Sequence, residues 1–170
     1  MKILKRSFLA LLSIMIGFFS CSCARATEKS TLEILRELVS MGEYAVLSEP
    51  LIYSSLADEG DAEYLSPEIK ISMYGEKRVS ECFDLIEDCA VCVCPGEISE
   101  LAVFKCYSKS DTDLVAAMCL ERADSLSIAL NSIDALNKNQ KAHIEIHGRY
   151  VLFSFADQSE SLIVRFRKLT

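Results

Sequence analysis

The spacing of hydrophobic and polar residues predicts two short helices in the first half of the chain. Residues 30–33 (STLE) resemble a capping box, and apolar residues then follow at helical spacing up to Gly42. Residues 66–68 (SPE) are typical of a helix start, with proline in the first turn, and Gly75 is a natural end for that helix. Between the two helices, residues 43–65 follow neither the helical nor the strand period clearly.

From residue 88 onward the pattern predicts paired strands around a long helix. In chain order the segments are strands at 88–94 and 101–107, a helix opened by residues 110–113 (SDTD), strands at 142–146 and 150–156, and a helix capped by Ser159. The last two strands are hinged at residues 147–148 (HG), which is typical of a hairpin. We therefore expect an α+β fold: an antiparallel sheet in ββαββα order with helices packed on one face, preceded by short N-terminal helices.

Both helices of this region carry an apolar stripe that predicts their core-facing side. The stripe of the long helix is Leu114, Val115, Met118, Cys119, Ala123, Leu126, Leu130 and Ile133, and that of the final helix is Leu162, Ile163, Phe166 and Leu169. The patterns divide the chain into a leader at 1–26, an N-terminal helical segment at 27–75 and an α+β domain at 76–170.

The leader has the layout of a secretory signal peptide. Lys2, Lys5 and Arg6 precede an apolar run at 8–19, and a small-residue cleavage motif follows. The run is shorter than the roughly 20 apolar residues that a membrane-spanning helix needs. We therefore expect an exported, extracytoplasmic protein.

Two processing routes remain open at the end of the leader. Residues 24–26 (ARA) match the motif of ordinary signal peptidase, which would release a secreted chain beginning at Thr27. Cys21, directly after the apolar run, resembles a bacterial lipobox cysteine. Phe19 is bulkier than the residue usually found two positions before that cysteine. Cys23 is a second candidate for lipid attachment. We favour a lipid-anchored protein of the cell membrane, with secretion as the alternative.

Charge and glycine spacing exclude several classes of partner and cofactor. The formal net charge is −7, and loss of the leader makes the mature chain more negative. Such a chain repels phosphate backbones and anionic headgroups, so we expect no nucleic-acid partner and a membrane link only through an acyl chain. The six glycines are too widely spaced for a phosphate-binding loop, and we expect no cofactor.

Six cysteines follow the leader, namely Cys82, Cys89, Cys92, Cys94, Cys106 and Cys119. An even number in an exported chain allows disulfides, with 15 pairings of six. Several of the six occupy positions with a core pattern, which favours reduced, buried thiols over disulfides and over metal binding. On a strand, Cys92 and Cys94 share one face and Cys89 points to the other, so the three do not converge on one zinc ion.

Two polar groups are candidates for chemistry. His143, Glu145 and His147 share one strand face, but residues i and i+4 on a strand lie about 13 Å apart, too far to bind one ion together. Since Ala142, Ile144 and Ile146 form the other face, we interpret the histidine face as the solvent side. Glu97 and Glu100 flank a tight connection, and a turn-stabilising role for Glu100 is favoured over acid–base catalysis.

The second half of the chain resembles a known family. Residues 87–108 (EDCAVCVCPGEISELAVFKCYS) and 147–157 (HGRYVLFSFAD) look like the domain of unknown function 4358 of exported proteins and lipoproteins from clostridia and related Gram-positive bacteria. The resemblance covers about residues 76–170, and its most specific pieces are residues 100–105 and 148–151. It implies an envelope location and no activity, and it offers no catalytic residue.

These observations favour an exported, membrane-tethered, non-catalytic binding or interaction module, whose partner is a cell-envelope protein or a small ligand. The alternative is a thiol- or metal-dependent extracytoplasmic enzyme that uses the strand at 89–94 or the His143/His147 face. A purely structural domain that assembles with other envelope proteins is a third hypothesis. The candidate functional surface consists of Glu100, Arg149, Tyr150, His143, Glu145 and His147.

Overall fold

The computed structural model describes residues 28–41, 50–94, 98–132, 140–156 and 160–170. Its α-helices are α2 (Thr31–Val39), α3 (Pro67–Tyr74), α4 (Glu76–Cys82), α5 (Thr112–Ser132) and α6 (Glu160–Leu169); its strands are β1 (Leu51–Ser54), β2 (Ile86–Val93), β3 (Glu100–Cys106), β4 (Lys141–His147) and β5 (Tyr150–Ala156); and its 3-10 helices are η2 (Phe83–Leu85) and η3 (Lys109–Asp111). The leader, including Cys21, Cys23 and the cleavage motif, lies outside these residues. None of the described helices is both long and apolar enough to cross a membrane.

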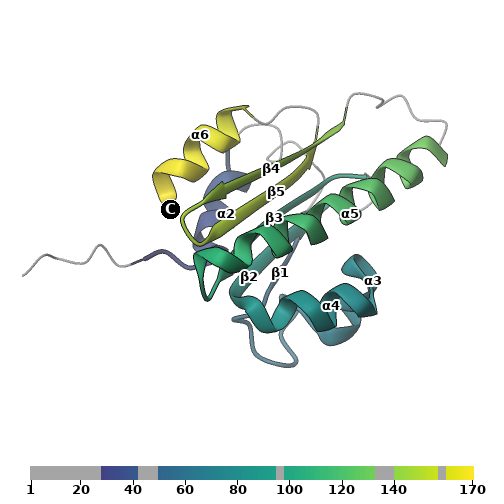
Figure 1. The fold of residues 1–170 in the computed structure, drawn as a ribbon, viewed down its shortest axis with the longest axis horizontal. Coiled ribbons are helices and arrows are strands. Elements are labelled where there is room, and N and C mark those ends of the chain that lie inside the picture. Colours follow the sequence, from purple (N-terminus) through teal and green to yellow (C-terminus); the bar gives the residue numbers. More distant parts are fainter. Residues whose placement is uncertain (1–27, 42–49, 95–97, 133–139, 157–159) are drawn as a thin grey trace, which may run out of the picture.

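The described strands form one antiparallel sheet in the order β1-β2-β3-β5-β4 (Figure 1). The predicted α+β class and the antiparallel sheet are therefore confirmed. From Ile86 to Leu169 the elements run β2, β3, η3, α5, β4, β5 and α6, so a 3-10 turn joins the expected strands and helices. Gly148 has a φ of 61° in the two-residue turn between β4 and β5. A turn of this kind needs positive φ, which glycine adopts without steric cost.

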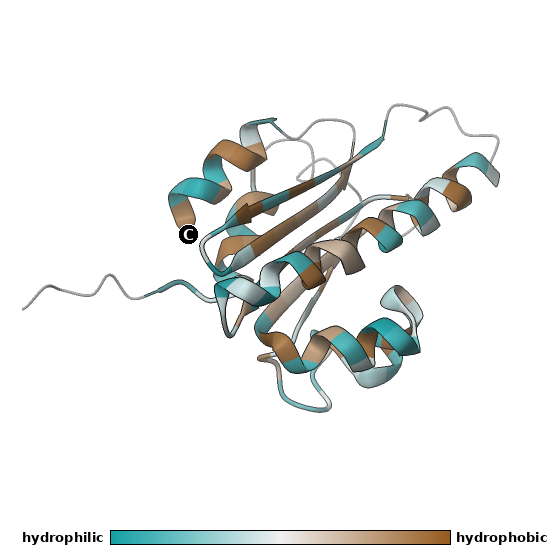
Figure 2. Cartoon of the chain, in the orientation of Figure 1, coloured by the Kyte–Doolittle hydropathy of each residue, from teal (hydrophilic) through white to brown (hydrophobic). Residues whose placement is uncertain are grey.

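Helices cover both faces of the sheet, so the expectation that they pack on one face is wrong. Helices α3, α4 and α5 lie on one side and α2 and α6 on the other (Figure 1). The physical reason is in the central strands, because every residue of β3 and β5 is buried and both faces therefore need cover. Figure 2 shows these strands as largely hydrophobic.

Local signals explain where the helices begin. Ser30 and Glu33 form the predicted capping box at the start of α2. Ser66 caps α3, Pro67 occupies its first turn, and Gly75 follows its last residue, as predicted.

The stripes of α5 and α6 largely match the prediction. On α5 the buried apolar residues are Val115, Met118, Cys119, Ala123 and Leu126, and on α6 they are Leu162 and Phe166. Leu114 is instead 40% exposed, because it lies at the edge of the stripe where η3 leads into α5. Ile133 and the predicted cap Ser159 lie outside the described residues.

The sequence pattern missed one strand and one α-helix. Strand β1 lies in the ambiguous segment 43–65 and pairs with β2. Helix α4 follows Gly75 without a side-chain cap. Because β1 joins the sheet and α2 packs on β2 and β3, the residues described between 28 and 75 share the cores of the rest of the chain.

Candidate functional site

Glu100, the first residue of β3, is buried inside the protein, with 1% of its surface exposed. Its predicted role in stabilising the turn before β3 stays a prediction, because residues 95–97 are not among the described residues. Arg122 of α5 donates a hydrogen bond from Nε to its Oε2 at 2.8 Å, and the Tyr74 hydroxyl donates to its Oε1 at 3.1 Å. Burial raises the pKa of Glu100, against the opposing effects of Arg122 and Tyr74. Glu97, its proposed partner, lies outside the described residues.

A hollow of about 350 Å³ lies beside Arg122. Helix α3 contributes most of its wall, and Tyr53 of β1 and Val93 of β2 complete it together with Arg122. No histidine lines this hollow. Its lining includes the carboxylate of Glu68 but not Glu100, so the hollow does not bring the buried carboxylate together with a second acid–base group.

Helix α6 covers the histidine face of β4 only in part, so the interpretation as the solvent side holds for exposed His147 but not for half-buried His143 and Glu145. Glu145 accepts a hydrogen bond from Nε of Arg167 at 2.6 Å, and Nδ1 of His147 lies 2.8 Å from the Thr170 hydroxyl. The β4–β5 register sets His143 beside Ser154 and Glu145 beside Leu152, and Leu152 belongs to the core under α2 and α6. A strand pattern shows which residues share a face, but the position of α6 decides which face is covered.

Glu100 and the histidines lie on opposite faces of the sheet. Glu100 is paired with Phe155, which belongs to the core under α5, whereas Glu145 is paired with Leu152 on the other side. The predicted functional surface is therefore not one surface. No cluster of three or more potential metal ligands is present in the described part of the chain.

Arg149 and Tyr150 hold the start of the described chain against the end of the sheet. Arg149 forms ion pairs with Glu28 at 3.0 Å and with Glu87 at 2.6 Å. Lys105 contacts the same two carboxylates at 3.1 and 2.9 Å. We call these four residues the N-terminal ion network.

Tyr150 adds a further contact to this segment, because its hydroxyl donates to the carbonyl oxygen of Lys29 at 3.2 Å. Hydrogen bonds from Lys105 and Arg149 lower the pKa of Glu87, and they also lower that of Glu28 although partial burial acts in the opposite direction. Arg149 and Tyr150 thus have a positioning role in this structure.

The cysteines are buried, and their thiols are expected to be poorly reactive. All six that follow the leader are free and buried. Burial raises the pKa of Cys89 and Cys92 to about 12 and that of Cys106 to about 11, and it also raises the values of Cys82 and Cys119. Cys89 faces one core while Cys92 and Cys94 face the other, as predicted. Thiols of raised pKa are poor nucleophiles at neutral pH because little thiolate is present.

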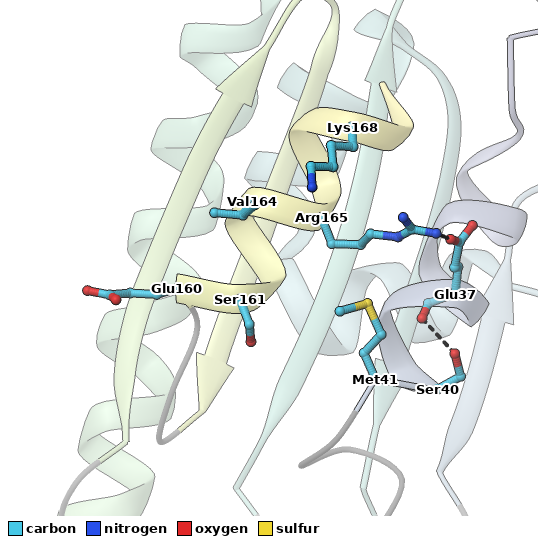
Figure 3. A pocket seen from close by; sticks show the side chains of 8 residues that line it. All are labelled: Glu37, Ser40, Met41, Glu160, Ser161, Val164, Arg165 and Lys168. Atoms are coloured by element: carbon cyan, nitrogen blue, oxygen red, sulfur yellow. Dashed lines mark hydrogen bonds and ion pairs between the residues drawn. The ribbon is translucent and has the colours of Figure 1, made fainter.

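A groove of about 680 Å³ lies between α2 and α6, and we call it the α2–α6 groove (Figure 3). Arg165 of α6 reaches across to form an ion pair with Glu37 of α2. Met41 and Val164 line it and are 37% and 54% exposed. Lys168 also lines the groove and forms no ion pair with a described residue.

Sequence reasoning missed this groove and the partners of the predicted residues. Arg122 carried a usable signal, since it lies four residues from both Met118 and Leu126 on the buried stripe of α5. Lys105 carried a similar signal inside the apolar strand β3. The groove had none, because two helices distant in sequence form it.

The two segments on which the expected family resemblance rests lie next to each other in the sheet. Residues 100–105 belong to β3, and residues 148–151 form the β4–β5 turn and the start of β5, which pairs with β3. Their roles in this structure are packing and the N-terminal ion network. In comparisons with protein-family models, curated proteins and solved structures, no match to the chain was found.

Proposed function

We propose that the chain is an exported, lipid-anchored envelope protein whose folded domain is a non-catalytic binding module with the α2–α6 groove as its contact surface. The observation that carries the proposal is the composition of the groove. Exposed Met41 and Val164 lie among the charges of Glu37, Arg165 and Lys168. Apolar side chains surrounded by charged ones are typical of surfaces that bind other proteins.

The groove favours an envelope protein over a small molecule as the partner. It is open to solvent, whereas small ligands are usually held in concave pockets that bury most of their surface. A partner segment with an apolar side chain against Met41 and Val164, and a carboxylate near Lys168, fits the lining.

The enzyme alternative lacks support in the described residues. The free cysteines are buried, and those with resolved shifts have raised pKa values. The carboxylate of Glu100 is held by Arg122 and Tyr74, and the ring of His147 contacts Thr170. Each of these groups contributes to packing or to an internal contact, and none lines the α2–α6 groove.

The N-terminal ion network supports a function close to the membrane. Glu28 follows Cys23 by five residues, and a peptide of that length spans at most about 18 Å. Acylation of Cys23 would therefore keep the end of the sheet that bears Glu28 and Arg149 near the lipid surface.

Intact-mass measurement of the membrane and medium fractions tests the location. The proposal expects a diacylglyceryl adduct on Cys21 or Cys23 in the membrane fraction. A chain in the medium that begins at Thr27 would contradict the anchor and leave the binding role to be tested separately.

Photo-crosslinking tests the groove. A photoreactive amino acid in place of Val164 should give a specific adduct with an envelope protein in the native host. The same amino acid in place of Leu56, which is equally well exposed at 58%, is the matched control and should not give that adduct. Identical adduct patterns at the two positions would contradict the proposed contact surface.

A further inference from the structure

The two edges of the sheet differ in how far other parts of the chain form hydrogen bonds with them. At the β1 edge, the backbone N–H of Ser54 donates to the carbonyl of Glu63 at 2.7 Å, and the N–H of Leu65 donates to the carbonyl of Ser54 at 3.1 Å. The chain thus covers part of its own four-residue strand. At the other edge, β4 is seven residues long, and within the described ranges it pairs with β5 alone. An uncovered strand edge is a template for another strand.

The backbone geometry identifies the groups that β4 presents outward. The N–H of Cys106 donates to the carbonyl of Arg149 at 2.8 Å, so the backbone N–H and C=O of Arg149 point toward β3. The direction of these backbone groups alternates along a strand. Those of Tyr150 therefore point toward β4, where Tyr150 pairs with His147. Continuing the alternation from His147 back along β4 leaves three residues whose N–H and C=O groups point away from the sheet, namely Ala142, Ile144 and Ile146.

Apolar side chains gather beside this edge. Ala142 is exposed, Ile146 is 38% exposed, and Ile144 packs partly against the core under α5. Helix α5 lies over β4 and β5, and the ion pair between Glu121 and Arg78 shows that α4 occupies one flank of that helix.

The opposite flank of α5 faces the outer edge of β4. It bears Ala116, which packs partly against the core, and Leu120 one turn later, which is 58% exposed. Leu120 and Ile146 therefore both contribute exposed apolar surface beside the outer edge of β4.

We propose that β4 pairs with β4 of a second copy of this chain, antiparallel and centred on Ile144, to give a continuous ten-stranded sheet. This register sets Ile144 opposite Ile144 and Ala142 opposite Ile146, so all three outward-pointing residues form hydrogen bonds in both copies. On the other face it sets Glu145 opposite His143 of the second copy, twice. Lys141 and His147, which are both exposed, meet at the two ends of the pairing.

Neighbouring registers fit less well. A centre on Glu145 places the two Glu145 carboxylates opposite each other, which is destabilising. A centre on His143 leaves Ile146 without an opposite residue in β4. A register centred between two residues opposes outward-pointing to inward-pointing backbone groups and forms no ladder.

The proposed β4–β4 pairing also brings the α5 helices of the two copies to a distance at which helices pack. Because α5 lies over β4 and β5, two copies joined through β4 bring their α5 helices about two strand spacings apart, or about 10 Å. That distance is typical of directly packed helices, and Leu120 lies on the flank where they meet. The α2–α6 groove lies on the other face of the sheet and remains open in this arrangement.

Light scattering on the exported, mature chain tests the pairing. The wild-type protein should have the mass of a dimer that dissociates on dilution. Ile146→Lys and Leu120→Lys should each weaken the dimer at least about tenfold, because each places a charge in the contact. Ile128→Lys is the matched control on the solvent side of α5, where the residue is 68% exposed, and should leave the dimer intact.

Amide hydrogen exchange resolved to single residues gives a second readout that does not depend on a variant. In the dimer the amides of Ala142, Ile144 and Ile146 should be protected, and dilution to the monomer should remove that protection. The amides of His143 and Glu145, which point toward β5, should stay protected in both states. A monomer at all concentrations, or a dimer that Ile146→Lys and Leu120→Lys leave unchanged, would overturn the proposal.

Discussion

Arg122 of α5 contacts a single carboxylate oxygen of Glu100 through two of its nitrogens, Nε and Nη2, each at 2.8 Å. The Glu100 side chain is 1% exposed and that of Arg122 is 17% exposed. This pair joins the first residue of β3 to the middle of α5 inside the protein. Desolvation offsets much of the attraction in such pairs, so the pair is weak evidence for net stability, although removal of one partner alone is costly.

Glu100→Gln should change how the stability of the protein depends on pH. Burial raises the pKa of Glu100 in the folded state above its usual value of 4.5, so the folded protein holds this proton more tightly than the unfolded chain. The stability that Glu100 contributes is therefore complete below about pH 4.5 and is lost as the pH rises through the folded-state pKa. Urea unfolding of both proteins across pH should show the wild type losing stability relative to Glu100→Gln over that interval. A constant difference would contradict the direction of the shift.

Arg122→Gln provides the complementary change. It leaves the buried carboxylate without its cation, which typically costs about 3–5 kcal/mol near neutral pH. The deficit should shrink in acid, because a protonated Glu100 no longer needs the cation. A deficit that is equal at pH 4 and pH 7 would show that Arg122 acts through packing and not through its charge.

Arg149→Gln should loosen the start of the folded chain while costing about 1 kcal/mol of global stability, since the side chains of its ion pairs are 34–48% exposed. Amide exchange at residues 28–30 should rise in the variant, and also in the wild type in about 1 M salt, where the Debye length falls to about 3 Å. Arg36→Gln, which removes another exposed ion pair, with Glu63, is the control and should leave these amides unchanged. Unchanged exchange in Arg149→Gln would contradict the role of the network.

Local chemistry allowed a large part of the fold to be predicted. The capping box at Ser30 depends on residues within one turn, and the β4–β5 hairpin depends on two turn residues, so short-range patterns reported both correctly. Strand β1 was missed because four residues are too few to show alternation, and its position depends on pairing with β2, far along the chain. The cover of both sheet faces likewise depends on where α2 and α6 pack.

The candidate site was less predictable, for the same reason. The alternation of residues along the strand correctly placed His143, Glu145 and His147 on one face. Which helix packs over that face depends on tertiary structure, and here it is α6. The partner of Glu100 is Arg122, which lies on a different element. A charged residue inside the buried stripe of α5 was the available sign that a buried acid exists elsewhere.

The native protein should resist thiol alkylation. All six described cysteines are buried, and pKa values of about 11 to 12 for Cys89, Cys92 and Cys106 leave little thiolate at pH 8. Iodoacetamide should label none of the six within minutes in buffer and all six in guanidinium, as read by intact mass. Rapid labelling of one native thiol would support the thiol-enzyme alternative. Masses lower by pairs of hydrogens would show disulfides instead.

Gly148→Ala should destabilise the β4–β5 hairpin through backbone conformation alone. Gly148 has a φ of 61°, and a Cβ built at this position meets nothing within 4 Å, so the substitution causes no clash. A left-handed conformation costs an ordinary L-residue roughly 1–2 kcal/mol, and we expect a loss of about that size in urea unfolding. Gly148→Asn should lose clearly less, because asparagine tolerates this conformation better. If Ala and Asn cost the same, the loss would come from the unfolded chain or the added side chain, and the positive φ would not be the reason for glycine here.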